Sequence, residues 1–379
     1  MGSLLPRLSQ NRNAVWIATA IIGIALLVLP FAAGLLGNAW VRALAFACLY
    51  VLLALGLNIV VGFAGLLDLG YIAFYAVGAY MYALLASPHL TSTFPWIAQM
   101  FPGGLHNSIW FVIPFGAGLA AMFGILLGAP VLKLRGDYLA IVTLGFGEII
   151  RIFINNLNAP VNITNGPQGI TLIDPISFGS VSLAKTQHFL GITLPSVHLY
   201  YYLFLALTLI AIVICVRLQD SRLGRAWMAI REDEIAAKAM GINVRNVKLL
   251  AFSLGATFGG VSGAMFSAFQ GFVSPESFTL NESIIVLAMV VLGGLGHIPG
   301  VVLGAVLLSI FPEVLRHTVT PVQTFLFGHV VVDAEVLRMM LYGLAMVLIM
   351  LYRPKGLWPA PEHGINPSDR RDAGKPQAA

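Results

Sequence analysis

The stretch Arg42–Val61, RALAFACLYVLLALGLNIVV, decides the fold class of this chain. Its only charge is at its first residue, and it matches the roughly 20 apolar residues that a helix needs to cross a bilayer. Similar runs recur along the 379-residue chain, of which 58% is hydrophobic and 10% charged. Soluble domains carry about 25% charged residues. The sequence therefore predicts an all-α, polytopic membrane helix bundle and excludes a water-soluble globular fold.

Ten apolar segments are expected to be membrane helices. They are Val15–Leu36, Arg42–Val61, Leu66–Ala86, Trp110–Val131, Tyr138–Asn155, Tyr200–Val216, Leu249–Gln270, Ile284–Gly296, Val301–Leu315 and Val336–Tyr352. The eighth and ninth are short, and they read either as two short helices or as one re-entrant hairpin. Gly255, Gly259 and Gly263 repeat every four residues, a spacing typical of close helix packing in lipid.

The Lys and Arg residues indicate the orientation, because cytoplasmic loops are enriched in them. Loops 87–109 and 271–283 hold none, whereas the segment after the sixth span holds seven: Arg217, Arg222, Arg225, Arg231, Lys238, Arg245 and Lys248. This alternation predicts cytoplasmic N- and C-termini; Arg42 and Arg316 are the exceptions to it. We therefore expect three regions: a cytoplasmic N-terminus (1–14), a transmembrane domain (15–354) that includes a cytoplasmic segment (217–248), and a disordered cytoplasmic tail (355–379).

Motifs of catalytic and nucleotide-binding sites are missing from the sequence. It contains no Gly-x4-Gly-Lys-[Ser/Thr] loop, and Gly294-Leu295-Gly296 lacks the third glycine of the dinucleotide fingerprint. No two histidines stand at metal-ligand spacing with a carboxylate. We expect no enzymatic activity and no catalytic residue, cofactor or metal on this chain. The net charge of +5 follows the membrane topology and predicts no nucleic-acid partner.

The segment 220–243, DSRLGRAWMAIREDEIAAKAMGIN, predicts two short helices on the cytoplasmic side. Asp220 or Ser221 can cap the first helix, whose apolar stripe consists of Ala226, Trp227 and Ile230. Negative charge at the first turn of the second helix suits its dipole and comes from Glu232, Asp233 and Glu234. Its apolar side holds Ile235, Ala239 and Met240, and Gly241 suits its C-cap. Such a pair predicts either a helix on the membrane interface or a docking element for a cytoplasmic protein.

A resemblance follows from these residues. Glu234-x-Ala236-Ala237-x3-Gly241 is similar to the Glu-Ala-Ala-x3-Gly loop of ABC-importer permeases, which forms the coupling helix that docks on the ATPase. Further stretches resemble the permeases of branched-chain amino-acid importers, in particular the M-type subunit of the Liv system. They are NIVVGFAGLLDLGYIAFYAVGAY (58–80), RGDYLAIVTLGFGEIIR (135–151), residues 224–241, QGFVSPESF (270–278) and VLGGLG (291–296). The first span and Pro167–His198 match poorly.

The resemblance implies one permease subunit of an ABC importer in the bacterial inner membrane, for branched-chain or other apolar amino acids. Its partners would be a second permease, two ATPases that bind ATP and Mg²⁺, a periplasmic binding protein and membrane lipid. Coupling to the ATPases would involve Arg222, Gly224, Arg225, Arg231, Glu232, Asp233, Glu234, Ala237 and Gly241. The alternative is an autonomous ion- or proton-coupled carrier with Glu148 as its coupling group, which would not require residues 222–241.

Polar residues within the fifth span are the candidates for the translocation path. Glu148 and Arg151 are separated by three residues and share a helix face, which Asn155 continues and near which Thr143 lies. Ionisable groups at this depth normally face a bundle interior or a cavity. They form either a structural ion pair that pins helices together or part of the border of the path. Outside this span, we expect Asn58 to join helices and Asp68 to cap the third.

Overall fold

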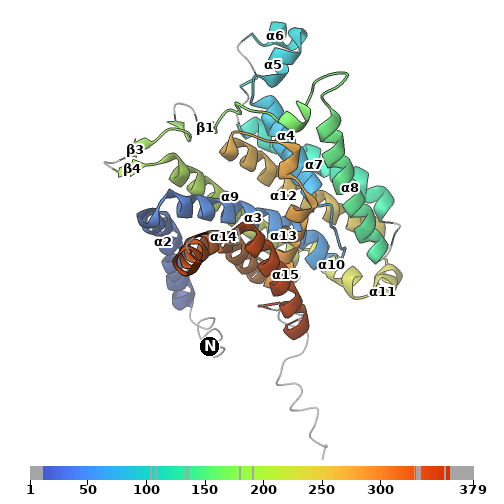
Figure 1. The fold of residues 1–379 in the computed structure, drawn as a ribbon. Coiled ribbons are helices and arrows are strands. Elements are labelled where there is room, and N and C mark those ends of the chain that lie inside the picture. Colours follow the sequence, from blue (N-terminus) through green and yellow to red (C-terminus); the bar gives the residue numbers. More distant parts are fainter. Residues whose placement is uncertain are drawn as a thin grey trace, which may run out of the picture.

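The computed structural model describes residues 12–102, 105–106, 109–132, 134, 136–178, 181–189, 192–327, 329, 334–353 and 356–358. Within them, each of the ten predicted segments overlaps a helix (Figure 1). These helices are α2 (Arg12–Leu36), α3 (Asn38–Leu57), α4 (Ile72–Leu85), α7 (Ile109–Val131), α8 (Asp137–Asn156), α9 (Ser196–Asp220), α12 (Val244–Gln270), α13 (Leu280–Gly293), α14 (Ile298–Phe327) and α15 (Ala334–Tyr352). Seven segments of the described chain are long and apolar enough to cross a membrane. The predictions for residues 1–11 and 359–379 lie outside the described residues.

Helix α12 is the centre of the bundle, where it packs against α7, α4 and α3. Glycines allow this packing, because a Cβ at Gly78 would lie 2.0 Å from the carbonyl oxygen of Gly260. A Cβ at Gly263 would lie equally close to the carbonyl oxygen of Tyr75. The packing role predicted for the repeated glycines of α12 is therefore confirmed.

Helix α3 continues into a π-helix, η1 (Asn58–Phe63). The Asn58 side chain accepts a hydrogen bond from the backbone N–H of Gly296 (2.9 Å), in the turn between α13 and α14. The predicted joining role of Asn58 is confirmed. π-helical turns are rare and often lie at functional sites.

The third membrane helix begins later than predicted, at Ile72 rather than Leu66. Gly65 adopts a positive φ of 68°, which ends the preceding turn and leads into a non-helical connection. Asp68 lies in this connection, where its Oδ1 accepts from the backbone N–H of Gly70 (2.9 Å). The residue stabilises the turn before α4 and does not cap the helix, so that prediction is wrong.

Helix α14 also differs from the prediction. It contains 30 residues, about 45 Å at 1.5 Å per residue, so the ninth segment is not short. The prediction ended it at Leu315, but the helix continues through Arg316 and His317. Helix α13 has 14 residues and follows a 3₁₀ turn, η3 (Pro275–Ser277).

The described chain is mostly helical, as predicted, and also includes two short hairpins that the prediction did not contain. Residues after α8 form two antiparallel hairpins: β1 (Ser177–Phe178) with β2 (Val181–Ser182), and β3 (Gln187–Phe189) with β4 (Ile192–Leu194). The same part of the chain includes the 3₁₀ turn η2 (Gly166–Gln168). The strands are too short to give a pattern of alternation. Figure 1 shows that short helices α5 (His89–Thr93) and α6 (Pro95–Met100) lie at the end of the bundle opposite α10 (Arg222–Glu232) and α11 (Glu234–Ala239).

Candidate functional site

Helix α10 turns sharply away from the end of α9. Ser221 caps it, since its Oγ accepts from the backbone N–H of Gly224 (3.1 Å). A Cβ on Gly224 would lie 2.2 Å from the carbonyl oxygen of Leu218, so the turn requires glycine. Arg225 donates to the backbone carbonyl of Asp220 (2.7 Å), while Arg222 is exposed. Glycine at this position therefore allows α10 to begin close to the end of α9.

The apolar stripe of α10 is buried inside the chain. Trp227 is fully buried, and its Nε1 donates to the carbonyl oxygen of Val247 on α12 (2.7 Å). Ile230 is buried beside it. The stripe was expected to need a partner surface, but this chain covers it.

Arg231 joins α10 to the π-helix. Its Nη1 donates to the backbone carbonyl of Gly62 (2.5 Å). A Cβ on Gly65 would lie 2.9 Å from Arg231 Cγ, and one on Gly296 would lie 2.9 Å from its Nη1. The side chain thus lies between η1 and the turn that Asn58 binds. Arg231 therefore contacts the helix bundle, whereas the sequence had suggested only a role towards the ATPase.

Helix α11 is capped at both ends. Asp233 Oδ1 accepts from the backbone N–H groups of Ile235 (2.8 Å) and Ala236 (3.0 Å). Gly241 has φ +86°, and its N–H donates to the carbonyl oxygen of Lys238 (3.1 Å). The role predicted for Gly241 at the C-terminal end is confirmed, whereas Asp233, which was predicted only to add negative charge at the first turn, also caps the helix. The two caps fix α11 as a separate short helix after the bend at Asp233.

An ion pair fastens α11 to α12. Glu234 Oε2 lies 2.7 Å from Lys248 Nζ, and Lys248 is buried. Ala237 is buried on the same side of the helix. A paired charge in a partly desolvated position holds its geometry better than an exposed pair. The ion pair therefore joins α11 directly to the central helix.

The opposite side of α11 is an exposed apolar face. Ile235 is 74% exposed and Met240 is 83% exposed, and Ala236 and Ala239 lie exposed between them. Two acidic side chains, Glu232 and Asp233, are exposed at its edge. Large apolar side chains grouped on an otherwise polar surface mark interaction sites. The predicted apolar side of the second helix is confirmed, and it faces away from the bundle.

The four residues predicted for the path form no single cluster. Arg151 Nε lies 2.9 Å from Glu148 Oε2, and Arg151 Nη1 lies 3.5 Å from Glu276 Oε1 of η3. This pair therefore joins α8 to η3, as the structural alternative expects. Thr143 instead accepts from the backbone N–H of Leu69 (3.1 Å). The Oδ1 atom of Asn155 is buried and has no hydrogen-bond partner among the described residues.

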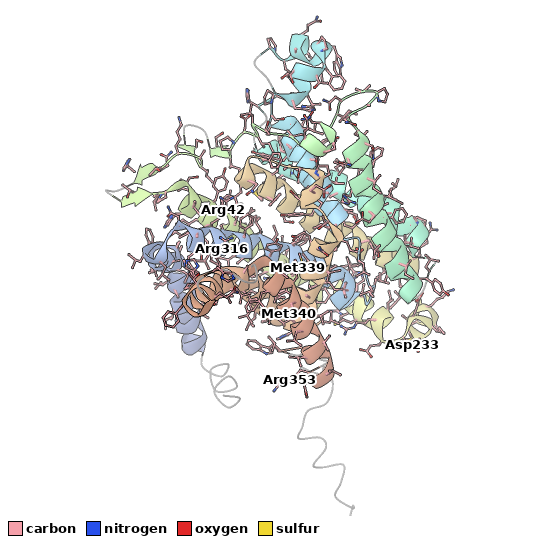
Figure 2. The ribbon with its side chains drawn as sticks, in the orientation of Figure 1. Arg42, Asp233, Arg316, Met339, Met340 and Arg353 are labelled. Atoms are coloured by element: carbon pink, nitrogen blue, oxygen red, sulfur yellow. The ribbon has the colours of Figure 1, made fainter. Side chains whose placement is uncertain are left out.

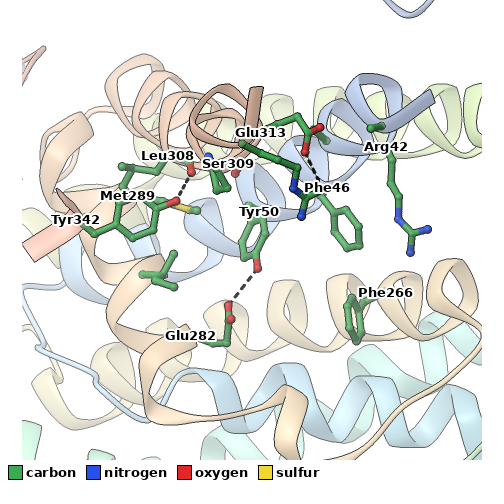
Figure 3. A pocket seen from close by; sticks show the side chains of 15 residues that line it. Arg42, Phe46, Tyr50, Phe266, Glu282, Met289, Leu308, Ser309, Glu313 and Tyr342 are labelled. Atoms are coloured by element: carbon green, nitrogen blue, oxygen red, sulfur yellow. Dashed lines mark hydrogen bonds and ion pairs between the residues drawn. The ribbon is translucent and has the colours of Figure 1, made fainter. Parts of the chain in front are cut away.

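A polar cleft lies elsewhere in the bundle, between α3, α12, α13, α14 and α15. Its volume is about 410 Å³, and it contains none of the four predicted path residues. Four ionisable side chains line it: Arg42, Glu282, Glu313 and Arg316. Figure 2 places Arg42 and Arg316 near each other, far from Asp233 of the α10–α11 segment. Figure 3 shows the Tyr50 hydroxyl meeting the Glu282 carboxylate across the cleft (3.1 Å).

Signals for this cleft were present in the sequence. Arg42 and Arg316 are the two residues that broke the alternation of basic and neutral loops. Glu313 lies inside the predicted ninth span, where an ionisable group is costly and commonly functional. Sequence reasoning did not connect them because they come from segments far apart in the chain.

The comparisons with known proteins identify the family. The family model described as branched-chain amino acid transport system / permease component matches residues 39–350. The chain belongs to this family. Its resemblance to importer permeases is thus confirmed, and so is the expectation that it is a transport permease rather than an enzyme. The family and the apolar helices together make it a multi-pass membrane protein.

Three relatives show how far the similarity extends. The high-affinity branched-chain amino acid transport system permease protein LivM of Escherichia coli is 43% identical over 323 residues, covering 82% of this chain and 68% of the relative. A probable LivM of Methanocaldococcus jannaschii is 27% identical, with 82% and 90% covered. LivH of Salmonella typhimurium, a permease protein of the high-affinity system, is 25% identical, with 69% and 80% covered. LivM and LivH are both described as permease proteins of the high-affinity branched-chain amino acid transport system, and this chain is similar to both. No solved structure gives a significant match.

Proposed function

We propose that this permease is one subunit of an ATP-driven importer of branched-chain amino acids in the bacterial inner membrane. The substrate class is supported by the family description and by the names of the LivM relatives. In this proposal a LivH-like chain completes the membrane part. The α11 end of the bundle faces the cytoplasm, as the distribution of Lys and Arg indicates.

The proposal places nucleotide chemistry on other chains. Two ATPase subunits bind ATP and Mg²⁺, a periplasmic protein delivers the amino acid, and this chain carries no cofactor. The surrounding lipid contacts the exposed apolar side chains of the bundle, and nucleic acid plays no part. The lack of a phosphate-binding loop in the sequence supports this division.

One observation carries the proposal: α11 presents an exposed apolar face while its other side is fastened to the bundle. Glu234 binds Lys248 of α12, and Arg231 of the preceding helix binds Gly62 of η1. An ATPase that moved α11 would therefore move the central helix and the π-helix together. The helix bundle would then alternate between outward-open and inward-open states and so carry the substrate across the membrane.

The first test concerns the contact between α11 and the ATPase. Ile235→Asp with Met240→Asp places two charges in the apolar face, where burial of unpaired charge is costly. We expect the ATPase subunits to be lost when the complex is purified through this chain. Thr171→Asp, at an exposed residue of the opposite end, is the matched control. Full retention of the ATPases by the double variant would contradict the docking role.

A second assay separates the ATP-driven importer from the autonomous carrier. If the chain belongs to an ATP-driven importer, proteoliposomes that contain it with its partner permease, but no ATPase, should not accumulate leucine under an ion gradient. Accumulation under that condition, with no nucleotide supplied, would favour a carrier in which Glu148 is the coupling group. The anchored α10–α11 segment would then have no mechanical role.

A further inference from the structure

We propose that the cleft between α3, α12, α13, α14 and α15 is a binding site for the transported amino acid in its zwitterionic form. Glu313 and Glu282 receive the ammonium group, while Arg42 and Arg316 receive the carboxylate. The inference rests on the function proposed above and adds a substrate site to it.

The charges of the cleft suit a zwitterion. Two arginines and two glutamates line it, so their formal charges cancel. A net anion or cation would add a charge that nothing in this neutral set balances. A molecule with one positive and one negative group satisfies both signs at once.

Glu313 has an oxygen that lacks a donor. Its side chain is only 11% exposed, and Oε1 accepts no hydrogen bond among the described residues, although His317 Nδ1 lies 3.3 Å away. The other oxygen lies 3.4 Å from Arg316 Nη1, longer than the roughly 2.7–2.9 Å of a good charge-assisted bond. An ammonium group supplies three N–H donors and would satisfy this carboxylate.

Arg42 has its guanidinium group oriented by contacts with Gln270, Phe46 and Phe269. Its Nη2 donates to Gln270 Oε1 (2.7 Å), and its guanidinium lies 5.5 Å from the ring centroid of Phe269 and 5.8 Å from that of Phe46. These contacts fix the plane of the group. Gln270 takes one of its five N–H donors, and the fork geometry of guanidinium is suited to a carboxylate.

The opposite end of the cleft is apolar. Figure 3 shows Met289, Leu308 and Tyr342 gathered at one end and Arg42 at the other. Ile285 adds apolar wall, and Phe266 lies nearer to Arg42, against Phe46. The volume of about 410 Å³ falls within the roughly 300–1,000 Å³ of small-molecule sites. A branched aliphatic side chain would lie at the apolar end while its charged groups reach the ionisable residues.

The same features predict weak binding. Arg316 is 70% exposed at its side chain, so its contact with a carboxylate competes with water. A permeation site must hold its solute well enough to admit it and loosely enough to release it. The cleft meets both requirements better than a closed, fully paired pocket.

Protection of a thiol in the cleft tests the proposal. The assembled transporter, with Cys48→Ala and Cys215→Ala, carries Ala43→Cys, at a lining residue of α3. A small methanethiosulfonate reagent then modifies the new thiol with and without L-leucine. We expect leucine near saturation to slow modification at least about threefold by occupying the cleft. N-acetyl-leucine amide, which has the same side chain but no charges, should not slow it, and Thr171→Cys should be unaffected by either.

The variant Glu313→Gln tests whether the charge of Glu313 is needed to bind leucine. It keeps the shape of the side chain but removes the charge, so protection by leucine should be lost while the thiol stays reactive. Equal protection by the blocked analogue, unchanged modification with leucine, or a thiol that the reagent cannot reach would each overturn the inference. Uptake of leucine is measured in the same preparation. If wild-type uptake is ATP-dependent and protection fails, only the cleft proposal is wrong; if uptake does not depend on ATP, the proposed function itself fails.

Discussion

Two sides of the same helix bundle are built in opposite ways. Where α12 meets α4, glycines bring backbones into direct contact, as at Gly78 and Gly263. Where α3 faces α13 and α14, aromatic and charged side chains line the cleft between the helices. Dispersion and close packing drive helix association in lipid, so the first side is the rigid one. The difference indicates that one side maintains the fold and the other leaves space for a solute.

Gly263→Leu should have the largest effect, because it breaks the packed side. A side chain there meets the carbonyl oxygen of Tyr75 at 2.0 Å from its Cβ alone, so α12 and α4 must separate. We expect most of the folded, monodisperse protein to be lost, as measured by size-exclusion chromatography in detergent. Gly118→Leu, where no atom lies within 4 Å of the added Cβ, should remain folded. Normal behaviour of Gly263→Leu would remove the contrast between the two sides.

A pair of serines sharpens the comparison. Both donate a hydrogen bond to a backbone carbonyl of their own helix, Ser262 to Gly259 (2.9 Å) and Ser309 to Ala305 (2.6 Å). Ser262→Leu overpacks the fully buried side and should reduce the free energy of unfolding by about 2–3 kcal/mol. Ser309 lines the cleft, so Ser309→Leu should change the free energy of unfolding by less than about 1 kcal/mol. Unfolding in a mixed-micelle denaturant titration measures both; equal losses would contradict the distinction.

Asn58→Ala tests the hydrogen bond that joins η1 to the turn between α13 and α14. It removes the acceptor of the Gly296 N–H and leaves that buried donor unpaired, which costs about 1–2 kcal/mol. The same denaturation assay measures the loss. Asn246→Ala, at an exposed site in the first turn of α12, serves as the control and should change stability much less. An unaffected Asn58→Ala would show that η1 is not held by this bond.

Glu276→Gln should have the smallest effect. Its carboxylate lies 3.5 Å from Arg151 and its side chain is 67% exposed, so the pair contributes less than about 1 kcal/mol. A larger loss, measured as a shift in thermal unfolding, would mean that η3 is anchored through α8. In that case the contact between Arg151 and Glu276 would contribute substantially to the stability of the bundle.

Much of the fold was predictable because helices and their caps depend on residues that are close together in the sequence. Each apolar segment overlaps a helix, and the caps at Ser221, Asp233 and Gly241 follow from residues adjacent in sequence. The full length of α14 was not evident because the polar residues Arg316 and His317 follow the apolar segment, and only Arg316 of the two lines the cleft. The short hairpins left no periodic signal.

The candidate site was predictable only in part. The α10–α11 segment is continuous, so its exposed face could be anticipated, although the burial of Trp227 against α12 could not. The cleft depends on Arg42 and Glu313, which are far apart in the chain. A single sequence shows each charge at membrane depth but not which charges meet. The roles proposed for Thr143 and Asn155 in the path stay predictions.

The proposed mechanism requires α11 to transmit the motion of the ATPases to α12, and exchanging the charges of the Glu234–Lys248 pair would interrupt that transmission. ATP hydrolysis and leucine uptake should be measured together in proteoliposomes with the complete transporter carrying Glu234→Lys, Lys248→Glu or both. Each single change sets like charges against each other at a 2.7 Å contact. We predict at least about tenfold less uptake per ATP hydrolysed for each single variant, and substantial recovery in the double variant, where the pair is restored with reversed sign. Normal coupling in both single variants would contradict the account.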